Sequence, residues 1–291
     1  MPEEVLQYLA PHPGGTYVDC TLGAGGHSRR IAAAIGHGRI VGFDKDPEAL
    51  ALARAAVPRP GVEFEAVHAD FAAAQEELRA RGIERVDGVI ADLGLSSMQL
   101  GRPERGFSFA ADGPLDMRMD PRQELTAEQV VNQFDERELA DLIFQLGEER
   151  RSRRIARAIV RSRPFHGTAQ LAALVAAVNR PVKPASGRPA RRGLHPATRT
   201  FQALRIFVNA EISSLASWLT SLPQWLAPAA RVVVISFHSL EDRPVKQNFR
   251  AGAQQGWYRL LTPHAVRPTQ AETAANPRSR SARLRAVERL A

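Results

Sequence analysis

The chain contains a single cysteine, Cys20, and no apolar stretch long enough to cross a bilayer. One thiol excludes an internal disulfide and a zinc site built from several cysteines, and this usage is typical of a reducing compartment. The longest strongly apolar run, Leu171 to Val178, is eight residues long, whereas a membrane helix needs about 20. No basic segment followed by an apolar one comes after Met1. We therefore expect a cytoplasmic protein without membrane attachment, and no metal, because the histidines lack metal-ligand spacing.

Lysine is also scarce, because 36 of the 39 basic residues are arginine, and the net charge is +8. The arginine fork pairs with phosphates and stacks on bases, so this excess favours a nucleic acid partner. The alternative is a solvated surface whose arginines reflect genomic base composition, and charge alone does not decide between the two. The arginines gather in three segments, which are residues 150–163, 188–205 and 278–289.

Apolar strand patterns alternate with helical patterns in the first third of the chain and return near residue 231. Such alternation predicts an α/β fold with a doubly wound, Rossmann-like parallel sheet. Asp46 is expected to cap a helix with Pro47 in its first turn. The expected strands are 16–18, 40–43, 62–67, 86–91, 231–237, 257–262 and 282–289, the last of them antiparallel, and the first helices are 28–35, 47 onward and 71–81.

The alternation stops after Asp92, and residues 101–119 are expected to form a long loop without periodicity. Thr126 to Gln129 fit a capping box, and the apolar period from there to Val178 is helical. These patterns predict a small all-α insert within a discontinuous α/β domain. The expected bounds are 104–198 for the insert, closed by a Pro-, Gly- and Arg-rich loop at 181–193, and 1–103 with 199–291 for the α/β domain. In that domain 200–222 are expected to be helical, and Ser239 to cap the helix after the strand at 231–237.

A glycine turn follows the first expected strand, in the run Val18 to Ser28, and Asp44 ends the second strand. Glycines let a ligand lie against the backbone, and a carboxylate one strand later can accept both hydroxyls of a ribose. The third glycine of the dinucleotide fingerprint is missing, and Asp19 would repel a pyrophosphate. Asp19 and Asp44 suit S-adenosylmethionine better, because it carries an ammonium, a sulfonium and a ribose but no phosphate. The alternative is a plain strand, turn and helix that binds no ligand.

Several longer motifs resemble those of one family. On these motifs the chain closely resembles the MraW (RsmH) family of bacterial 16S ribosomal RNA cytosine-N4 methyltransferases, over essentially its whole length. It departs from the family at the start, where members carry a His-x-Pro-Val-Leu segment and this chain reads Met1-Pro2-Glu3-Glu4, so contacts of that segment are not carried over. The motifs are Asp92–Gln99, Arg105–Phe109, Gly113–Met119, His195–Arg205, Ser236–Arg243 and Asn276–Ser281.

The resemblance implies a class I S-adenosylmethionine-dependent methyltransferase sheet with an inserted small all-α domain that recognises RNA. It implies S-adenosylmethionine as methyl donor, S-adenosylhomocysteine as product, and a decoding-centre cytidine of 16S rRNA in the small ribosomal subunit (cytosine 1402 in the usual rRNA numbering) as acceptor. It does not indicate whether the protein is a monomer or a dimer. The cofactor-binding residues that it implies are Gly25, Gly26, His27, Asp44, Phe71, Asp92 and Gln99.

Asp92 is also the candidate catalytic residue. The cytosine amino group is a poor nucleophile, because its lone pair is delocalised into the ring, and a carboxylate is a natural acceptor for its N4–H groups. Methylation of cytosine C5 would need a thiolate, but Cys20 is expected to fill space. Methylation of a ribose commonly uses a lysine base, and only Lys45 lies near the expected site. Both of these chemistries are therefore weaker interpretations.

The target base must leave its stack to reach such a site, so aromatic and basic side chains are candidate RNA contacts. For each aromatic residue the alternative is packing in the core. Two other functions stay open, namely a small-molecule methyltransferase on the same fold and a non-enzymatic RNA-binding assembly factor. The candidate RNA contacts are Arg105, Arg118 and Arg199 for phosphates, Phe107, Phe109, Phe237, Trp257 and Tyr258 for stacking, and His238 for a structural or RNA-contact role.

Overall fold

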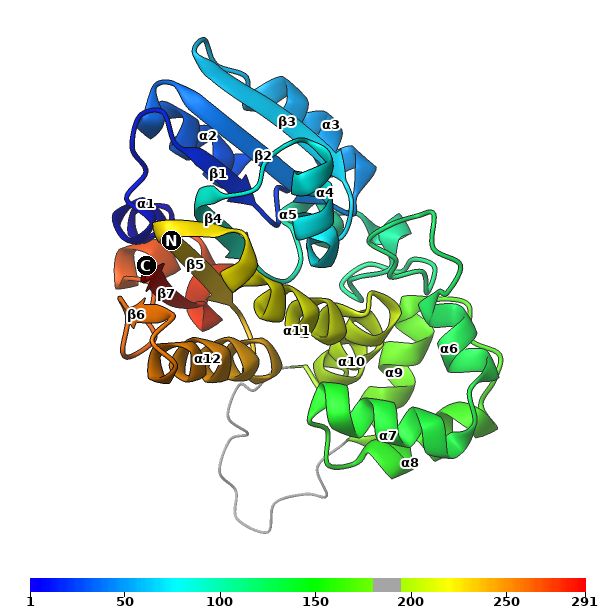
Figure 1. Ribbon diagram of the computed structural model, residues 1–291. Helices are drawn as coiled ribbons and strands as arrows, with labels where there is room; N and C mark the ends of the chain where they lie inside the picture. The colour runs from blue at the N-terminus through cyan, green and yellow to red at the C-terminus, as the bar shows by residue number, and fades with distance from the viewer. Residues whose placement is uncertain (180–194) are drawn as a thin grey trace. The chain divides into compact units, whose positions relative to one another are not determined.

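A computed structural model describes residues 1–179 and 195–291. The loop expected at 181–193, with its arginines, lies outside the described residues. The chain forms two compact units (Figure 1), with Met1–Gly94 and Ile212–Ala291 in unit 1 and Leu95–Glu211 in unit 2. Unit 2 contains the insert expected at 104–198 and also takes in residues 95–103 and 199–211.

Unit 1 is built on a seven-stranded sheet with the order β3-β2-β1-β4-β5-β7-β6 within the described residues. Neighbouring strands are parallel from β3 to β5, and β7 runs antiparallel to both β5 and β6. This is the class I methyltransferase arrangement, and it confirms the expected fold class. The strands are β1 Thr16–Asp19, β2 Gly38–Asp44, β3 Val62–His68, β4 Val86–Asp92, β5 Leu226–Ser236, β6 Tyr258–Leu260 and β7 Arg283–Arg289.

Helices cover both faces of this sheet, which explains its apolar central strands. Val232 and Val234 of β5 point into one core with residues of α4, α11 and α12. Val233 and Ile235 point into a second core with residues of α1 and α2. Because successive side chains of a strand alternate between faces, a sheet buried on both sides needs an unbroken apolar run. The helices of unit 1 are α1 Pro2–Leu9, α2 Gly26–Ile35, α3 Pro47–Ala56, η1 Phe71–Ala73, α4 Ala74–Ala80, α11 Glu211–Ser221 (from Ile212 onward), η3 Leu222–Gln224, α12 Ser239–Gln254, α13 Gln270–Ala275 and η4 Pro277–Ser281.

The predicted cap at Asp46 is confirmed, because its side chain accepts a hydrogen bond from the backbone of Glu48. The predicted cap at Ser239 is wrong by one residue. The residue that precedes α12 is His238, and the side chain of Glu241 reaches back to its backbone N–H. A carboxylate three residues into a helix can satisfy this donor, so the helix begins where Glu241 can fold back.

Unit 2 is helical in its described part, and its apolar helix faces pack into one core. The predicted capping box is confirmed, since Thr126 and Gln129 accept each other's backbone N–H groups. No helix among the described residues of either unit has the length and apolarity needed to cross a membrane. The helices are α5 Ser97–Gly101, η2 Pro103–Arg105, α6 Ala127–Gln133, α7 Glu136–Gly147, α8 Ser152–Arg161, α9 Thr168–Val178 and α10 Thr198–Val208.

Residues 200–222 are helical as predicted, but a break after Val208 divides them into α10 and α11. Ala210 adopts a left-handed backbone with φ of 51° at the break. The buried side chain of Asn209 accepts a hydrogen bond from the backbone of Met119 (2.7 Å) and donates one to the carbonyl of Met117 (2.8 Å). Asn209 therefore ends α10 and fixes a loop some ninety residues earlier in the chain.

Candidate active site

Four acidic or aromatic side chains of unit 1 follow neighbouring parallel strands at the points where the strands end. Asp19 ends β1, Asp44 ends β2, Phe71 follows β3 and Asp92 ends β4. Parallel strands place their carboxyl ends at one edge of a sheet, which is where open α/β sheets bind ligands. The β-strand register brings these positions to the same edge (Figure 1). Four of the predicted site residues thus lie on one rim of unit 1.

The turn between β1 and α2 holds its backbone in a shape that only glycine accepts easily. Gly25 has φ of 79°, and a Cβ added there would lie 2.3 Å from Cγ2 of Val57. A Cβ on Gly26 would meet no atom within 4 Å, so that side of the turn is open. No side chain in residues 1–179 or 195–291 caps the N-terminus of α2. Its first-turn N–H groups can therefore receive a carboxylate such as that of a methionine moiety.

Asp44 is held by backbone donors on both carboxylate oxygens. Oδ2 accepts the N–H of Gly23 (2.7 Å) and Oδ1 that of Asp46 (2.9 Å), which leaves one lone-pair direction on each oxygen for a ribose hydroxyl. Burial raises the pKa of Asp44 to about 6 despite these hydrogen bonds. The group is therefore mainly ionised at neutral pH.

Asp19 lies beneath the glycine turn rather than on its surface, and only 1% of it is exposed. Its Oδ2 accepts a hydrogen bond from the hydroxyl of Ser28 (2.7 Å), and its Oδ1 accepts the N–H of Thr21 (3.2 Å). Burial raises the pKa of Asp19 above its ordinary value. Asp19 therefore orders the turn from behind, and the interpretation that it contacts the cofactor's ammonium directly finds no exposed carboxylate to support it.

Asp92 and His27 form a polar pair at the centre of this rim. Nε2 of His27 lies 3.3 Å from Oδ2 of Asp92, and the backbone N–H of Asp92 donates to Oγ1 of Thr21 (2.6 Å). Oδ1 of Asp92 is buried and has no hydrogen-bond partner among the described residues. Burial alone would lower the pKa of His27, but the neighbouring Asp92 raises it above its ordinary value. An unpartnered buried carboxylate oxygen is costly. Because 33% of the Asp92 side chain is exposed, unlike that of Asp19, this carboxylate is the candidate acceptor for a ligand's N–H or O–H.

Phe71 packs edge to face on Trp218, with ring centroids 5.8 Å apart. Beside it, Asp70 accepts a hydrogen bond from Ser214 and pairs with Lys45, both at 2.6 Å. The sequence did not predict this cluster. The available signal was an aspartate at a helix start, because Asp70 is the N-cap residue of η1. The cluster fixes the end of β3 and holds the side chain of Lys45 on the carboxylate of Asp70.

Phe237 and His238, two candidate RNA contacts, directly follow β5 and so lie at the same carboxyl-terminal edge of the sheet as Asp92. Glu241 is 2% exposed, and its Oε2 accepts the N–H of Phe237 at 2.8 Å. Nε2 of His238 lies 3.0 Å from Oε1 of Glu241. The pair favours a structural role for His238, in which the imidazole and the turn after β5 are held by one buried carboxylate.

Trp257 and Tyr258 are candidate stacking residues by sequence. The topology places them at the amino-terminal edge of the sheet, away from the carboxyl ends of the parallel strands. Tyr258 pairs with Arg289 at the far end of β7, whereas Arg283 at the start of β7 pairs with Ser236 at the carboxyl end of β5. Because β7 is antiparallel, Arg289 lies at the amino-terminal edge. Neither aromatic ring can therefore stack on a base held at the carboxyl ends of the strands.

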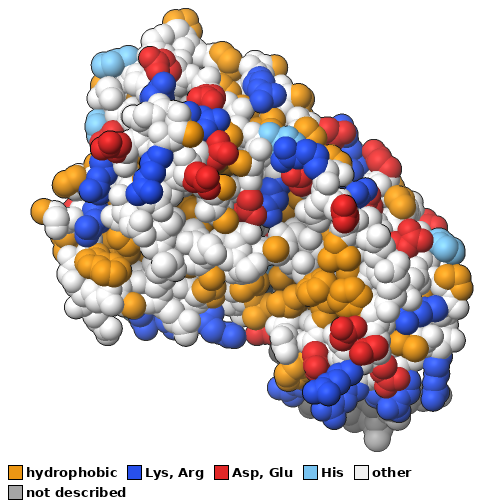
Figure 2. All heavy atoms as spheres, turned by 45° about the vertical axis from the view of Figure 1, so that its right-hand side comes forward, with side chains coloured by type: hydrophobic (Ala, Val, Ile, Leu, Met, Phe, Trp, Pro, Cys, Tyr) orange, Lys and Arg blue, Asp and Glu red, His pale blue; other side chains and the backbone are white. Residues whose placement is uncertain are grey.

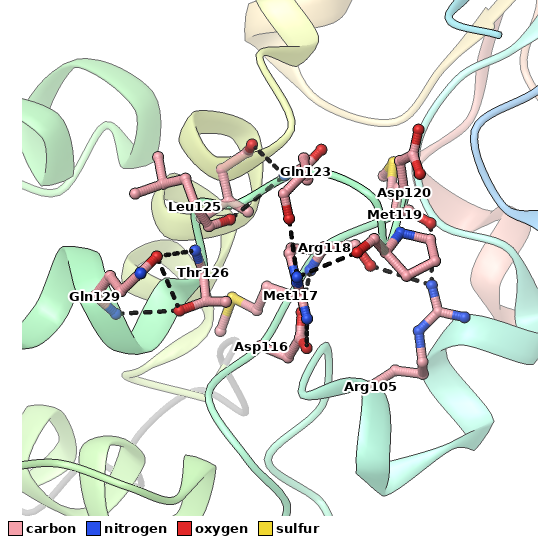
Figure 3. Close-up of polar contacts among 12 residues, drawn as sticks. Arg105, Asp116, Met117, Arg118, Met119, Asp120, Gln123, Leu125, Thr126 and Gln129 are labelled. Atoms are coloured by element: carbon pink, nitrogen blue, oxygen red, sulfur yellow. Dashed lines mark hydrogen bonds and ion pairs between the residues drawn. The ribbon is translucent and has the colours of Figure 1, made fainter.

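Arg105 and Arg118 lie in unit 2, and their guanidinium groups make hydrogen bonds inside the expected loop (Figure 3). Arg118 pairs with Asp116 through Nε and Nη2, both at 2.8 Å. Arg105 donates from Nη2 to the carbonyls of Arg118 and Met119, each at 3.1 Å. Burial would raise the pKa of Asp116, but Arg118 lowers it below its ordinary value. These arginines thus order the loop, and contact with RNA stays a prediction for them.

The remaining predicted residues also lie in unit 2. Gln99 is buried and forms a capping box with Ser96. Its contact with the cofactor stays a prediction. Phe107 is 6% exposed and belongs to the core. Phe109 packs on the ring of His195, with centroids 4.6 Å apart. Arg199 is exposed and donates to the carbonyl of Glu148.

The chain is similar to a well-defined set of proteins. The model of the MraW methylase family matches residues 1–290. A protein of Koribacter versatilis named ribosomal RNA small subunit methyltransferase H is 52% identical over 295 residues, which cover 99% of this chain and 92% of that protein. Proteins of the same name from Acidobacterium capsulatum and Solibacter usitatus are 50% and 47% identical, covering 99% of this chain and 96% and 98% of their own length. A family match over nearly the whole chain, with relatives at about half identity, shows that the chain belongs to the MraW methylase family.

Proposed function

We propose that this protein transfers a methyl group from S-adenosylmethionine to the N4 amino group of a cytidine in 16S rRNA of the small ribosomal subunit, cytosine 1402 in the decoding centre. S-adenosylhomocysteine is the other product. Because the proposed substrate is ribosomal RNA, the proposal includes a cytoplasmic site of action. Family membership and the names of the relatives support the methyltransferase activity and the rRNA substrate. The choice of base and atom rests on the geometry around Asp92.

The single observation that carries the choice of an amino acceptor is the buried, unpartnered Oδ1 of Asp92 at the end of β4. Cytosine N4 presents N–H donors, and a carboxylate is the acceptor that suits them. The reaction forms the N4–methyl bond, breaks the methyl–sulfur bond and releases one proton from N4. S-adenosylmethionine supplies the activated methyl group on a positively charged sulfur.

The residues of unit 1 divide the remaining tasks. Asp92 accepts an N4–H and so turns the nitrogen lone pair toward the methyl carbon, which is catalysis by orientation. His27 and the hydroxyl of Thr21 hold Asp92 in place. Asp44 accepts the ribose hydroxyls, and the N-terminus of α2 after Gly25 receives the methionine carboxylate. Phe71 borders the adenine.

The two competing acceptors are disfavoured by the same structure. Burial raises the pKa of the Cys20 thiol well above its ordinary value, so no thiolate is available to attack a cytosine ring. The side chain of Lys45 is engaged by Asp70 at 2.6 Å, which disfavours it as the base for a ribose hydroxyl. An exocyclic amine is therefore the acceptor that this rim serves best.

A methyl-transfer assay tests the proposal. Tritiated S-adenosylmethionine is offered with small subunits, with free 16S rRNA and with small amines, and the labelled nucleoside is then identified. We expect label in N4-methylcytidine from an rRNA substrate. Label only in small molecules, label on another atom of the nucleoside, or RNA binding without any transfer would each overturn it.

The raised pKa of Asp44 predicts a pH dependence of cofactor binding. The ribose hydroxyls donate to the ionised carboxylate, so affinity is full above the pKa of about 6 and falls as Asp44 protonates below it. The dissociation constant of S-adenosylhomocysteine should rise about tenfold between pH 7 and pH 5. Calorimetry across this range measures it.

The matched control for this titration is Asp44→Asn, which keeps His27 and its own titration. This variant should bind the cofactor product more weakly at pH 7 and lose most of the change between pH 7 and pH 5. If its pH profile runs parallel to that of the wild type, the titrating group is not Asp44.

A further inference from the structure

Helix α8 of unit 2 carries a row of arginines along one face. Arg153, Arg154, Arg157 and Arg161 are all exposed. At 3.6 residues per turn these positions fall within an arc of about 100°, and at 1.5 Å per residue they span about 12 Å. Figure 2 shows Lys and Arg side chains gathered beside Asp and Glu side chains over the region of α7 and α8. The α8 row, by which we mean these four arginines, is therefore a linear cationic surface.

Only one arginine of the α8 row has a carboxylate partner within the described residues. Arg157 pairs with Glu136 of α7 at 3.1 Å. The other acidic residues of α7 are engaged elsewhere, since Asp141 faces Arg137 and Glu138 accepts the N–H of Asp135. Helix α9 has no charged residue, and the sequence 180–194 contains no Asp or Glu. Arg153, Arg154 and Arg161 thus have no carboxylate partner among the described residues.

The opposite face of α8 is buried. Ile155, Ala156 and Ile159 are 0% exposed and belong to the core of unit 2. A helix that lies on a membrane surface needs a free apolar face to insert, and α8 has none left. A single small phosphate is bound by groups that converge, whereas this row is straight and lies on a convex helix surface. Both points favour an extended polyanion whose phosphates follow one another along a strand.

We infer that the α8 row binds the phosphate backbone of the RNA substrate. The inference rests on the proposed rRNA substrate and deepens it, because it names the face of unit 2 that holds the RNA. The other candidate phosphate contacts of this unit are partly occupied, since Arg118 pairs with Asp116 and Arg105 donates to backbone carbonyls. The α8 row supplies sequence-independent affinity that positions the substrate, while Asp92 meets the base.

The test is the triple variant Arg153→Gln, Arg154→Gln, Arg161→Gln, which keeps the Arg157–Glu136 pair and good helix propensity. The matched control is Arg59→Gln, Arg79→Gln, Arg250→Gln. These three arginines are exposed in unit 1, have no described acidic partner and lie toward the amino-terminal edge of the sheet, so the change in net charge is identical. Binding of 16S rRNA and of small subunits is measured at several salt concentrations, with thermal unfolding and S-adenosylhomocysteine binding as checks of the fold.

For the α8 triple variant we expect the slope of log K against log salt to fall in magnitude by about 2 to 3, and affinity at physiological salt to fall on the order of 10- to 100-fold. The KM for rRNA should rise with little change in kcat, and cofactor binding should stay at the wild-type value. The control triple should keep most of the RNA affinity.

Several outcomes would overturn the assignment without touching the proposed function. These are wild-type RNA binding by the α8 triple variant, an equal loss in both triples, or a loss confined to binding of vesicles rich in phosphatidylserine. The proposed function fails separately, if the wild-type protein transfers no methyl group to rRNA.

Discussion

Replacing Asp92 by alanine should lower the rate of methyl transfer by about three orders of magnitude while the protein stays folded. The variant loses the only carboxylate on the rim with a buried oxygen that has no partner in the described residues, so nothing orients the amino lone pair. The fold should survive, because among the described residues the side chain makes one polar contact, with His27 at 3.3 Å, and the backbone bond to Thr21 remains. Single-turnover methylation of rRNA, beside thermal unfolding, measures both effects.

Two further variants make this result interpretable. Asp92→Asn keeps a carbonyl acceptor without the charge and should fall between the wild type and Asp92→Ala. Asp141→Asn removes an exposed carboxylate of α7 whose ion pair is long, at 3.9 Å, and should leave the rate unchanged. If Asp92→Ala turns over at the wild-type rate, another residue orients the amine and Asp92 has no catalytic role.

The strands of unit 1 could be predicted from the sequence because their signals are local. The run from Val232 to Ile235 lies on a strand that is buried on both faces of the sheet, so it is continuously apolar and easily recognised. The helix break at Asn209 and Ala210 could not be predicted in this way. Its cause is a set of hydrogen bonds to Met117 and Met119, which are distant in the chain and carry no periodic signal.

The candidate site likewise has residues that local sequence signals predict and features that depend on distant parts of the chain. Asp44 and Asp92 were predictable because each ends an apolar strand, and parallel strands bring their carboxyl ends together. The free oxygen of Asp92 depends on what surrounds it, and the Lys45–Asp70 pair depends on two different loops. Trp257 could be only a candidate stacking residue, because sequence alone does not show at which edge of the sheet β6 begins.

Replacing Gly25 by alanine should lower the free energy of unfolding by about 2 to 4 kcal/mol and weaken cofactor binding more than tenfold. The φ of 79° costs an L-residue about 1 to 2 kcal/mol, and the new Cβ would lie 2.3 Å from Cγ2 of Val57, which forces a shift of the packed core. Because Gly25 precedes α2, the shift moves the helix N-terminus that receives the methionine carboxylate. The midpoint of thermal unfolding should therefore fall by about 5 to 15 °C.

Substitutions at two other glycines distinguish the possible causes of these effects. Gly82 tests backbone strain without a steric clash, and Gly26 tests contact with the ligand without either. Gly82 has φ of 70° but no atom within 4 Å of an added Cβ, so Gly82→Ala should cost only the backbone strain, about 1 to 2 kcal/mol. Gly26→Ala has open space and no positive φ, so it should keep the wild-type stability and lose cofactor affinity if the ligand lies against the turn. Equal unfolding of Gly25→Ala and Gly82→Ala would show that Val57 yields without cost. Unchanged cofactor affinity in Gly26→Ala would place the cofactor away from this turn, because an added methyl group there has no other neighbour to meet.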